Sequence, residues 1–137
     1  MTDQAIEQEI QDKGLTAPRV TPADIEANIV SEHYFTAADG VDGADIAAAR
    51  AESSHEALTI IALDDDVSKA GTPMAALGLL TFCVLVLRNG FTVTGESACA
   101  SPENFDAEIG RKIARQNAVN KVWPLMGYAL KDRLAKA

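Results

Sequence analysis

Histidines and acidic runs are the first candidates for chemistry in this sequence of 137 residues. His33 and His55 lie far apart, and neither has a carboxylate at the spacing of a metal site. The run Asp64 to Asp66 lacks the alternating oxygen ligands and the distal glutamate of a calcium loop. The sequence contains no phosphate-binding loop, nucleophile elbow or paired-cysteine motif. We therefore predict no metal site, no cofactor and no enzymatic activity.

Polar residues near the C-terminus are stronger candidates for ligand binding. Gln116, Asn117 and Asn120 fall on or beside the expected buried face of one helix. There they either hydrogen-bond neighbouring backbone or read the base edges or ribose of a small ligand, because unpaired polar groups are costly when buried. Arg111 and Arg115 lie four residues apart on another face, where they either belong to a solvated, ion-paired surface or bind an anion.

A β-hairpin is the clearest element that positions these residues. Residues 79–88 and 91–97 are rich in β-branched and aromatic residues and flank Asn89-Gly90, which predicts a two-residue type I′ turn. With that turn Val86 pairs with Val93, and one face carries Phe82, Val84, Val86, Phe91 and Val93. The first strand is apolar on both faces, so helices or a second subunit must cover each face.

Helices are expected to pack against this hairpin. A Thr21-Pro22 start and a Ser101-Pro102 start each place a capping residue before a first-turn proline. Pro124 lacks an N–H and is expected to break the last helical region. The predicted helices cover about 22–32, 102–123 and 125–135. The buried stripe of the second is predicted to be Phe105, Ile109 and Ile113.

The chain is therefore predicted to be a single α+β domain over residues 21–137, with a small antiparallel sheet at about 79–98. Residues 1–20 are an N-terminal arm and linker, with a marginal helix between Thr2 and Gly14. Residues 37–75 are a variable insertion, in which we expect loops around Asp39-Gly40 and Asp42-Gly43 and a short helix near 46–52. Residues 58–63 fit either a strand or the end of a helix.

Charge is divided unevenly along the chain, whose formal net charge is −8 at pH 7. Residues 1–66 hold 15 acidic and three basic residues, a net of −12, whereas residues 67–137 hold five acidic and nine basic residues, a net of +4. The overall charge argues against binding to long nucleic acids or anionic membranes. The asymmetry indicates either two halves that pack together or an anion site on the basic half.

Targeting signals are absent from the sequence. The residues after Met1 have neither the basic nor the apolar region of a secretory signal. The longest apolar stretch, residues 74–87, has 14 residues and falls short of the ~20 that cross a bilayer. Cys83 and Cys99 are too few for a disulfide framework and are expected to be reduced. We expect a cytoplasmic protein that is neither secreted nor bound to a membrane.

Three sequence runs carry a family resemblance. They are NGFTVTGESACASPENFD at 89–106, IGRKIA at 109–114, and NKVWPL at 120–125 followed by Gly127-Tyr128. Together they resemble the small tailed-phage proteins called the gp forty-nine/gp sixty-six family, over roughly residues 79–134. The resemblance implies a phage protein that acts in the cytoplasm of the infected bacterial host.

The hairpin-and-helix pattern is also similar to the first class of Thoeris anti-defence proteins. These phage proteins trap cyclic ADP-ribose signals, and sometimes cyclic oligonucleotides, by stoichiometric binding as oligomers. The resemblance implies ligand-facing positions at Phe91, Ser101 and Asn104, with Arg115 and Asn117 near a basic helix position. We expect a homo-oligomeric, non-enzymatic protein that sequesters a small anionic nucleotide. The alternative is an interaction module that binds a host protein through its acidic first half.

Overall fold

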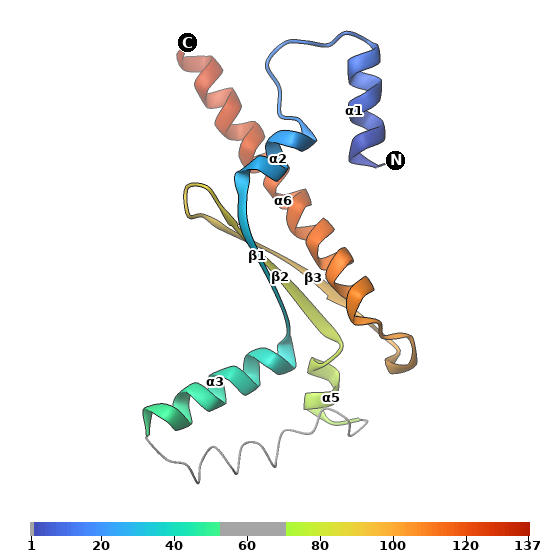
Figure 1. The fold of residues 1–137 in the computed structure, drawn as a ribbon, viewed down its shortest axis with the longest axis vertical. Helices are drawn as coiled ribbons and strands as arrows, with labels where there is room; N and C mark the ends of the chain where they lie inside the picture. The colour runs from blue at the N-terminus through green and yellow to red at the C-terminus, as the bar shows by residue number, and fades with distance from the viewer. Residues whose placement is uncertain (1, 53–70) are drawn as a thin grey trace.

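The computed structural model describes residues 2–52 and 71–137. Its elements in chain order are α1 (Asp3–Asp12), α2 (Pro22–Asn28), β1 (Ile29–Thr36), α3 (Ala37–Ala51), α5 (Pro73–Leu77), β2 (Leu80–Leu87), β3 (Thr92–Ala98), the 3-10 helix η1 (Pro102–Asn104) and α6 (Ala107–Lys136). The strands form one antiparallel sheet in the order β1-β2-β3, and α6 crosses one face of it (Figure 1). The fold has the predicted α+β class. The predictions for His55, residues 58–63 and Asp64 to Asp66 lie outside the described residues.

Capping side chains decide where the first two helices begin. The Thr2 hydroxyl accepts a hydrogen bond from the Ala5 N–H at 3.1 Å and starts α1 as predicted. Thr21 and Asp24 form a reciprocal capping box at the start of α2, with Pro22 in its first turn. The predicted helix over 22–32 is too long, because α2 ends at Asn28 and the chain continues into β1.

β1 is the strand that the sequence interpretation missed. The i, i+4 spacing of Ile25 and Ile29 suggested a helix that continued, but the residues after Asn28 are mainly β-branched, aromatic and polar, which favours a strand. Ser31 pairs with Val86 and Tyr34 with Cys83 in the antiparallel register. β2 is therefore the central strand.

The predicted hairpin exists, but its loop has three residues instead of two. The Leu87 N–H donates to the Phe91 carbonyl at 2.9 Å, and Gly90 closes the loop with a φ of 87°. This arrangement is typical of a three-residue loop that ends in a left-handed glycine. Val93 consequently pairs with Leu85 and not with Val86.

This one-residue shift moves the residues of β3 to the other face of β2. The face that packs against α6 carries the buried residues Thr81, Cys83, Leu85, Leu87, Val93 and Gly95. The predicted grouping of Val93 with Phe82, Val84 and Val86 is therefore wrong, since those three side chains lie on the opposite face. The faces of β2 differ clearly in burial, although both are apolar.

α6 packs on the sheet through small residues. Gly110, Ala114 and Ala118 are buried on its sheet-facing side. A Cβ atom added to Gly95 of β3 would lie 2.1 Å from the Ala114 carbonyl oxygen, so the two backbones are in direct contact at this point. The close approach requires glycine on the strand and small side chains on the helix.

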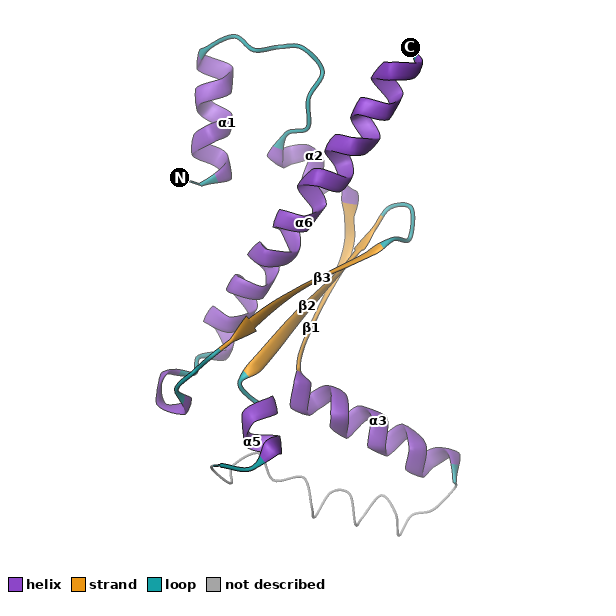
Figure 2. Ribbon diagram, turned by 180° about the vertical axis from the view of Figure 1, so that it is seen from behind, coloured by secondary structure: helices purple, strands orange, loops and turns teal. Residues whose placement is uncertain are grey.

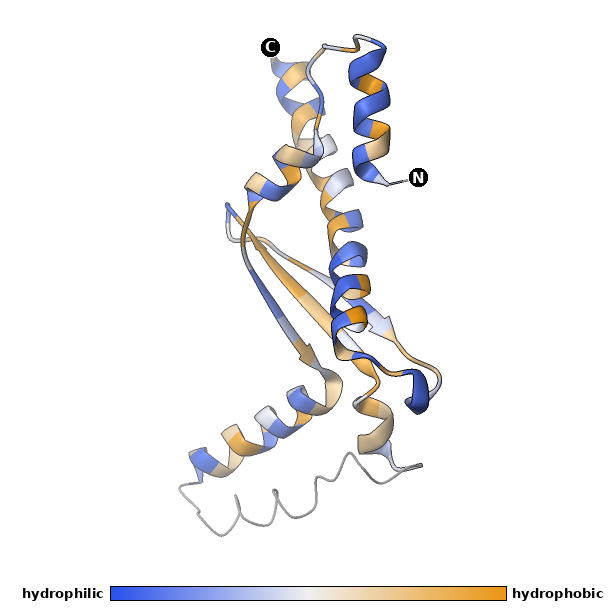
Figure 3. Ribbon diagram, turned by 45° about the vertical axis from the view of Figure 1, so that its right-hand side comes forward, coloured by the Kyte–Doolittle hydropathy of each residue, from blue (hydrophilic) through white to orange (hydrophobic). Residues whose placement is uncertain are grey.

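The larger apolar residues of α6 lie partly outside the core. Ile109 and Ile113, predicted to be buried with Phe105, are 56% and 46% exposed. Figure 3 shows hydrophobic positions on the solvent side of α6 near its start. The prediction failed because a helical stripe was assigned by side-chain size, whereas the sheet selects the small residues.

α6 is one helix where two were predicted. It begins at Ala107, because Asp106 accepts a hydrogen bond from the Ile109 N–H at 3.0 Å, and Ser101-Pro102 starts only the short η1. It continues through Pro124, which lacks the N–H that would bond the Asn120 carbonyl. Asn120 and Pro124 are both exposed, so water can satisfy that carbonyl.

The described parts of the predicted insertion are helical. α3 runs through both predicted loops, starting from a capping box between Thr36 and Asp39, and its many alanines favour the helix. α3 and α5 lie beyond the end of the sheet, so the face opposite α6 carries no described helix (Figure 2).

Candidate ligand-binding cavities

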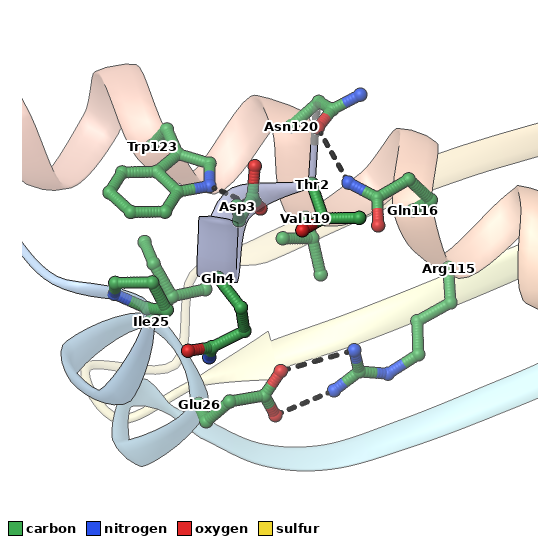
Figure 4. A pocket seen from close by; sticks show the side chains of 11 residues that line it. Thr2, Asp3, Gln4, Ile25, Glu26, Arg115, Gln116, Val119, Asn120 and Trp123 are labelled. Atoms are coloured by element: carbon green, nitrogen blue, oxygen red, sulfur yellow. Dashed lines mark hydrogen bonds and ion pairs between the residues drawn. The ribbon is translucent and has the colours of Figure 1, made fainter. Parts of the chain in front are cut away.

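A cavity of about 550 Å³ lies where α1 approaches α2 and α6, and we call it the arm cavity (Figure 4). α6 contributes Trp123 and the amides of Gln116 and Asn120, which hydrogen-bond each other at 2.9 Å. The indole N–H of Trp123 donates to Asp3 of α1 at 3.3 Å. This hydrogen bond joins the arm to α6 at one side of the cavity.

Arg115 lies at the edge of this cavity and is already neutralised. Its guanidinium donates two hydrogen bonds to Glu26, at 2.8 and 3.2 Å, and its Nε donates to Glu32 at 2.9 Å. These bonds, chiefly those to Glu26, raise the pKa of Arg115 above its ordinary value. A phosphate would have to displace a carboxylate to reach this side chain.

Glu32 extends this network toward the sheet. Burial favours its neutral form, but hydrogen bonds from Arg115 and from the Tyr34 hydroxyl, the latter at 3.0 Å, outweigh burial and lower its pKa. Burial, and then the bond to Glu32, raise the pKa of Tyr34, so the phenol stays protonated. The buried Cys83 beside it also has a raised pKa because it is desolvated. Both cysteines are free, as predicted.

A second cavity, of about 350 Å³, has a different chemistry, and we call it the arginine cavity. Arg19 of the linker, Arg88 of the hairpin loop and Arg133 of α6 line it. Within the described residues, the side chains of Arg88 and Arg133 form no ion pair, whereas Arg19 is paired with Glu7. Its other lining residues include the apolar Val20, Ala27, Met126, Ala129 and Leu130 and the polar Asn28 and Asp24.

The arginine cavity suits a small anion better than the arm cavity does. Guanidinium groups bind phosphate through paired, charge-assisted hydrogen bonds, and the apolar floor can accept a base or another flat group. Its volume lies within the ~300–1,000 Å³ of ordinary ligand sites. No spacing in the sequence indicated this site, because Arg19, Arg88 and Arg133 come from three separate segments.

The structure does not bring the five predicted site residues together. Phe91 is 56% exposed beside the hairpin loop. Ser101 precedes η1 without a capping bond, and Asn104 lines a separate cavity of about 140 Å³. Arg115 is at the arm cavity, and Asn117 donates to the Glu96 carbonyl at 2.8 Å.

The predicted amides of α6 also differ from expectation in their burial. Gln116, Asn117 and Asn120 are all exposed, because the buried face of α6 is that of its alanines. Asn117 ties the helix to strand backbone, which is one of the two roles considered for these residues. Gln116 and Asn120 line the arm cavity, where they hydrogen-bond each other.

Comparison with known proteins identifies the family. A model of the phage protein (N4 Gp49/phage Sf6 gene 66) family matches residues 20–134. The match spans most of the chain, so the chain belongs to this phage protein family, as its sequence runs indicated. No curated protein and no solved structure matched the chain.

Two properties of the described residues bear on the kind of site. They contain no group of three or more histidine, cysteine or acidic residues that could hold a metal ion. None of their helices is long and apolar enough to cross a bilayer.

Proposed function

We propose that this phage protein sequesters a small phosphorylated nucleotide signal by stoichiometric binding in the arginine cavity. The observation that carries the proposal is the convergence of Arg19, Arg88 and Arg133 on one cavity in a chain of net charge −8. Isolated cations on such a surface are usually paired with carboxylates. Arg88 and Arg133 have none among the described residues, so both guanidinium groups are open to an anion.

Cyclic ADP-ribose isomers and cyclic oligonucleotides are the ligands that we infer, from the sequence resemblance to anti-defence proteins. Their phosphates would accept hydrogen bonds from Arg88 and Arg133, and a base would lie on Met126 and Leu130. Under this proposal the ligand leaves unchanged: Asp24 is the one carboxylate among the described lining residues, and no histidine, lysine or second carboxylate lines the cavity beside it. Sequestration of an immune signal takes place in the host cytoplasm, and no cofactor is needed.

Calorimetric titration tests the proposal. Cyclic ADP-ribose isomers and cyclic di- and trinucleotides are titrated into the protein, and the ligand is then recovered by denaturation and identified by chromatography. We expect saturable heat with one ligand class and its recovery intact. Absence of heat and of a thermal shift at high micromolar ligand would refute the proposal, and a converted ligand would refute its non-enzymatic part.

Variants locate the site. Arg88→Gln and Arg133→Gln each remove a charge-assisted hydrogen bond of ~1.5–3 kcal/mol, so each should weaken binding at least tenfold. Lys121→Gln removes an exposed cation of α6 that lies outside the cavity and is the matched control. Equal losses from all three variants would indicate nonspecific attraction of the anion.

Binding of a host protein through the acidic first half is the second candidate. α3 favours it, because this helix carries three aspartates and one arginine and extends away from the sheet (Figure 1). A stoichiometric host partner in a pull-down, lost in Asp39→Asn with Asp45→Asn, would support this function. Nucleotide binding by the same double variant would stay intact under the first proposal.

A further inference from the structure

Arg19 takes part in two features of the molecule at once. Its guanidinium lines the arginine cavity together with Arg88 and Arg133. Both of its terminal nitrogens also donate to the carboxylate of Glu7 on α1, at 2.5 and 2.7 Å. Glu7 accepts a further hydrogen bond from Gln11 at 2.7 Å. The N-terminal arm and the arginine cavity therefore share one guanidinium group.

We propose that Glu7 is an internal competitor of the ligand, so that an anion bound to Arg19 in the arginine cavity displaces Glu7 and releases α1. A carboxylate and a phosphate form the same paired hydrogen bonds with a guanidinium, and they therefore compete for it. The inference rests on the proposed function, because it concerns the same cavity. It adds a residue outside the cavity lining that sets ligand affinity, and a movement that follows binding.

The other contacts of α1 are weak enough for this release. α1 lies at the periphery of the molecule (Figure 1), and two cavities of about 550 and 250 Å³ lie between it and its neighbours. Ile6, which faces the smaller cavity, is 43% exposed. The hydrogen bond from Trp123 to Asp3 is long, at 3.3 Å. Among the described residues, none from α1 belongs to the hydrophobic core, so the bond between Glu7 and Arg19 is a main attachment of the arm.

The linker allows α1 to leave while Arg19 stays in the cavity. Residues 15–18 are exposed and lie outside helices and strands. Arg19 itself is followed by Val20, which packs against the hydrophobic core, and by the buried Pro22 at the start of α2. The flexible part of the chain therefore precedes Arg19, and the backbone after Arg19 is held by the core.

Low exposure of Glu7 favours displacement over joint binding of the two anions. One guanidinium can hold two carboxylates, as Arg115 does with Glu26 and Glu32. Those two side chains are 58% and 39% exposed, whereas the side chain of Glu7 is 10% exposed. Water screens neighbouring charges at an exposed site and screens them much less at a buried one. A phosphate beside Glu7 is therefore repelled more strongly than a second carboxylate at Arg115.

Competition of this kind acts in both directions. The ligand weakens docking of the arm, and the docked arm weakens binding of the ligand by the same factor. The apparent affinity is lowered by the fraction of molecules in which Arg19 is free. Since coupling between two sites changes affinity about 5- to 150-fold, we expect Glu7→Gln to tighten anion binding about fivefold or more.

Hydrogen exchange and calorimetry on the full chain test the inference, with inorganic pyrophosphate as the probe. Pyrophosphate should accelerate amide exchange in α1 but not in β2 or α6, whereas sodium chloride of equal ionic strength should leave α1 unchanged. Glu9→Gln is the matched control variant. It removes a carboxylate from the same helix, but one that is paired with Lys13, so it should behave like the wild type in both measurements.

Two variants separate competition from simple loss of the arm. Glu7→Gln should exchange rapidly in α1 without ligand and bind pyrophosphate more tightly than the wild type. Arg19→Gln should also exchange rapidly in α1, but it should not bind more tightly, because it lacks the contested group. Circular dichroism confirms that both variants are folded.

The outcomes distinguish this inference from the proposed function. Binding of pyrophosphate without faster exchange in α1, or with equal affinity in the wild type and Glu7→Gln, would overturn the inference alone. Absence of heat from pyrophosphate in both proteins would also overturn it. The proposed function is decided separately, by the titration with cyclic nucleotides.

Discussion

Glu7 ties the N-terminal arm to its own linker. Glu7 is only 8% exposed, and its carboxylate accepts hydrogen bonds from Arg19 at 2.5 and 2.7 Å and from Gln11 at 2.7 Å. The bonds from Arg19, followed by the bond from Gln11, lower the pKa of Glu7 to about 2. The charge of Glu7 is therefore a structural requirement of the arm. Because Arg19 is ion-paired with Glu7, part of its hydrogen-bonding capacity is already used before a ligand enters the arginine cavity.

The arm should detach in acid because of this residue. The folded-state pKa lies below the ~4.3 of an unfolded glutamate, so the ion pair stabilises the arm above that pH and its contribution is lost as pH falls from about 5 to 2. The fluorescence of Trp123, the single tryptophan, reports the contact with Asp3 of α1. We expect a transition in this window for the wild type and none of that origin in Glu7→Gln. Superimposable curves would contradict the assignment.

Gly95 is the residue at which the sheet and α6 leave no space. An added Cβ would lie 2.1 Å from the Ala114 carbonyl oxygen and 2.3 Å from the Ala118 nitrogen, so the helix would have to move away from the strand. We expect Gly95→Ala to lower the free energy of unfolding by about 3 kcal/mol or more. Chemical denaturation measures the change.

Gly127 provides the matched control for Gly95. It lies inside α6, and an added Cβ would meet nothing within 4 Å. Gly127→Ala should therefore stabilise the protein by about 0.5–1 kcal/mol, through helix propensity alone. Destabilisation by both substitutions to a similar extent would show that the contact at Gly95 is not the cause.

Among the elements, α6 contains the clearest opportunity to increase stability. Pro124 interrupts the hydrogen bonds of a helix that continues on both sides of it. Pro124→Ala restores the bond to the Asn120 carbonyl and should raise the free energy of unfolding by up to ~3 kcal/mol. Thermal unfolding measures the gain. An unchanged or lower melting temperature would mean that Pro124 fits a bend that the helix needs for packing.

Local sequence signals predicted where several elements begin but not the register of the strands. Thr2, Thr21 and Asn89-Gly90 marked two helix starts and a hairpin correctly, because caps and turns depend on a few adjacent residues. The strand register depends on whether the loop has two or three residues, and both loops accept Asn-Gly. The packing of Gly95 on α6, which needs the three-residue loop, is a contact between distant segments that the local sequence does not contain.

The sequence predicted less of the candidate site than of the fold. Arg88 and Arg133 line one cavity because β1 follows α2 and pairs with β2, which brings α2 beside the hairpin loop. The Arg88 N–H donates to the Asn28 carbonyl of α2 at 3.0 Å. Without β1 this meeting could not be foreseen. Arg115, singled out from its helical spacing, proved to be engaged by Glu26 and Glu32, which lie 89 and 83 residues away.

On the scale of the whole molecule, the acidic first half and the basic second half are joined by specific ion pairs. Arg115 of α6 bonds Glu26 and Glu32, so part of the charge asymmetry is used to hold α2 and β1 to α6. The interpretation that the two halves pack together is therefore supported. The alternative interpretation, an anion site on the basic half, applies to Arg88 and Arg133, which form no ion pair among the described residues.

The arm should be separable from the rest of the molecule. The buried core consists of residues from Ile25 onward and includes none from α1. We expect the chain without residues 1–19 to stay folded and to unfold cooperatively, at a melting temperature a few degrees lower. Near-ultraviolet circular dichroism and calorimetry measure both properties. Loss of cooperative unfolding would show that the arm belongs to the core domain.

The arm also lies outside residues 20–134, the part of the chain that matches the family. One wall of the arm cavity is thus formed by a segment outside the matched residues, while the opposite wall is formed by α6. Changes in the first 19 residues alter the shape and charge of that cavity without touching the contact between sheet and helix. Substitutions in this arm are therefore expected to change what the cavity admits while leaving the packing of α6 on the sheet intact.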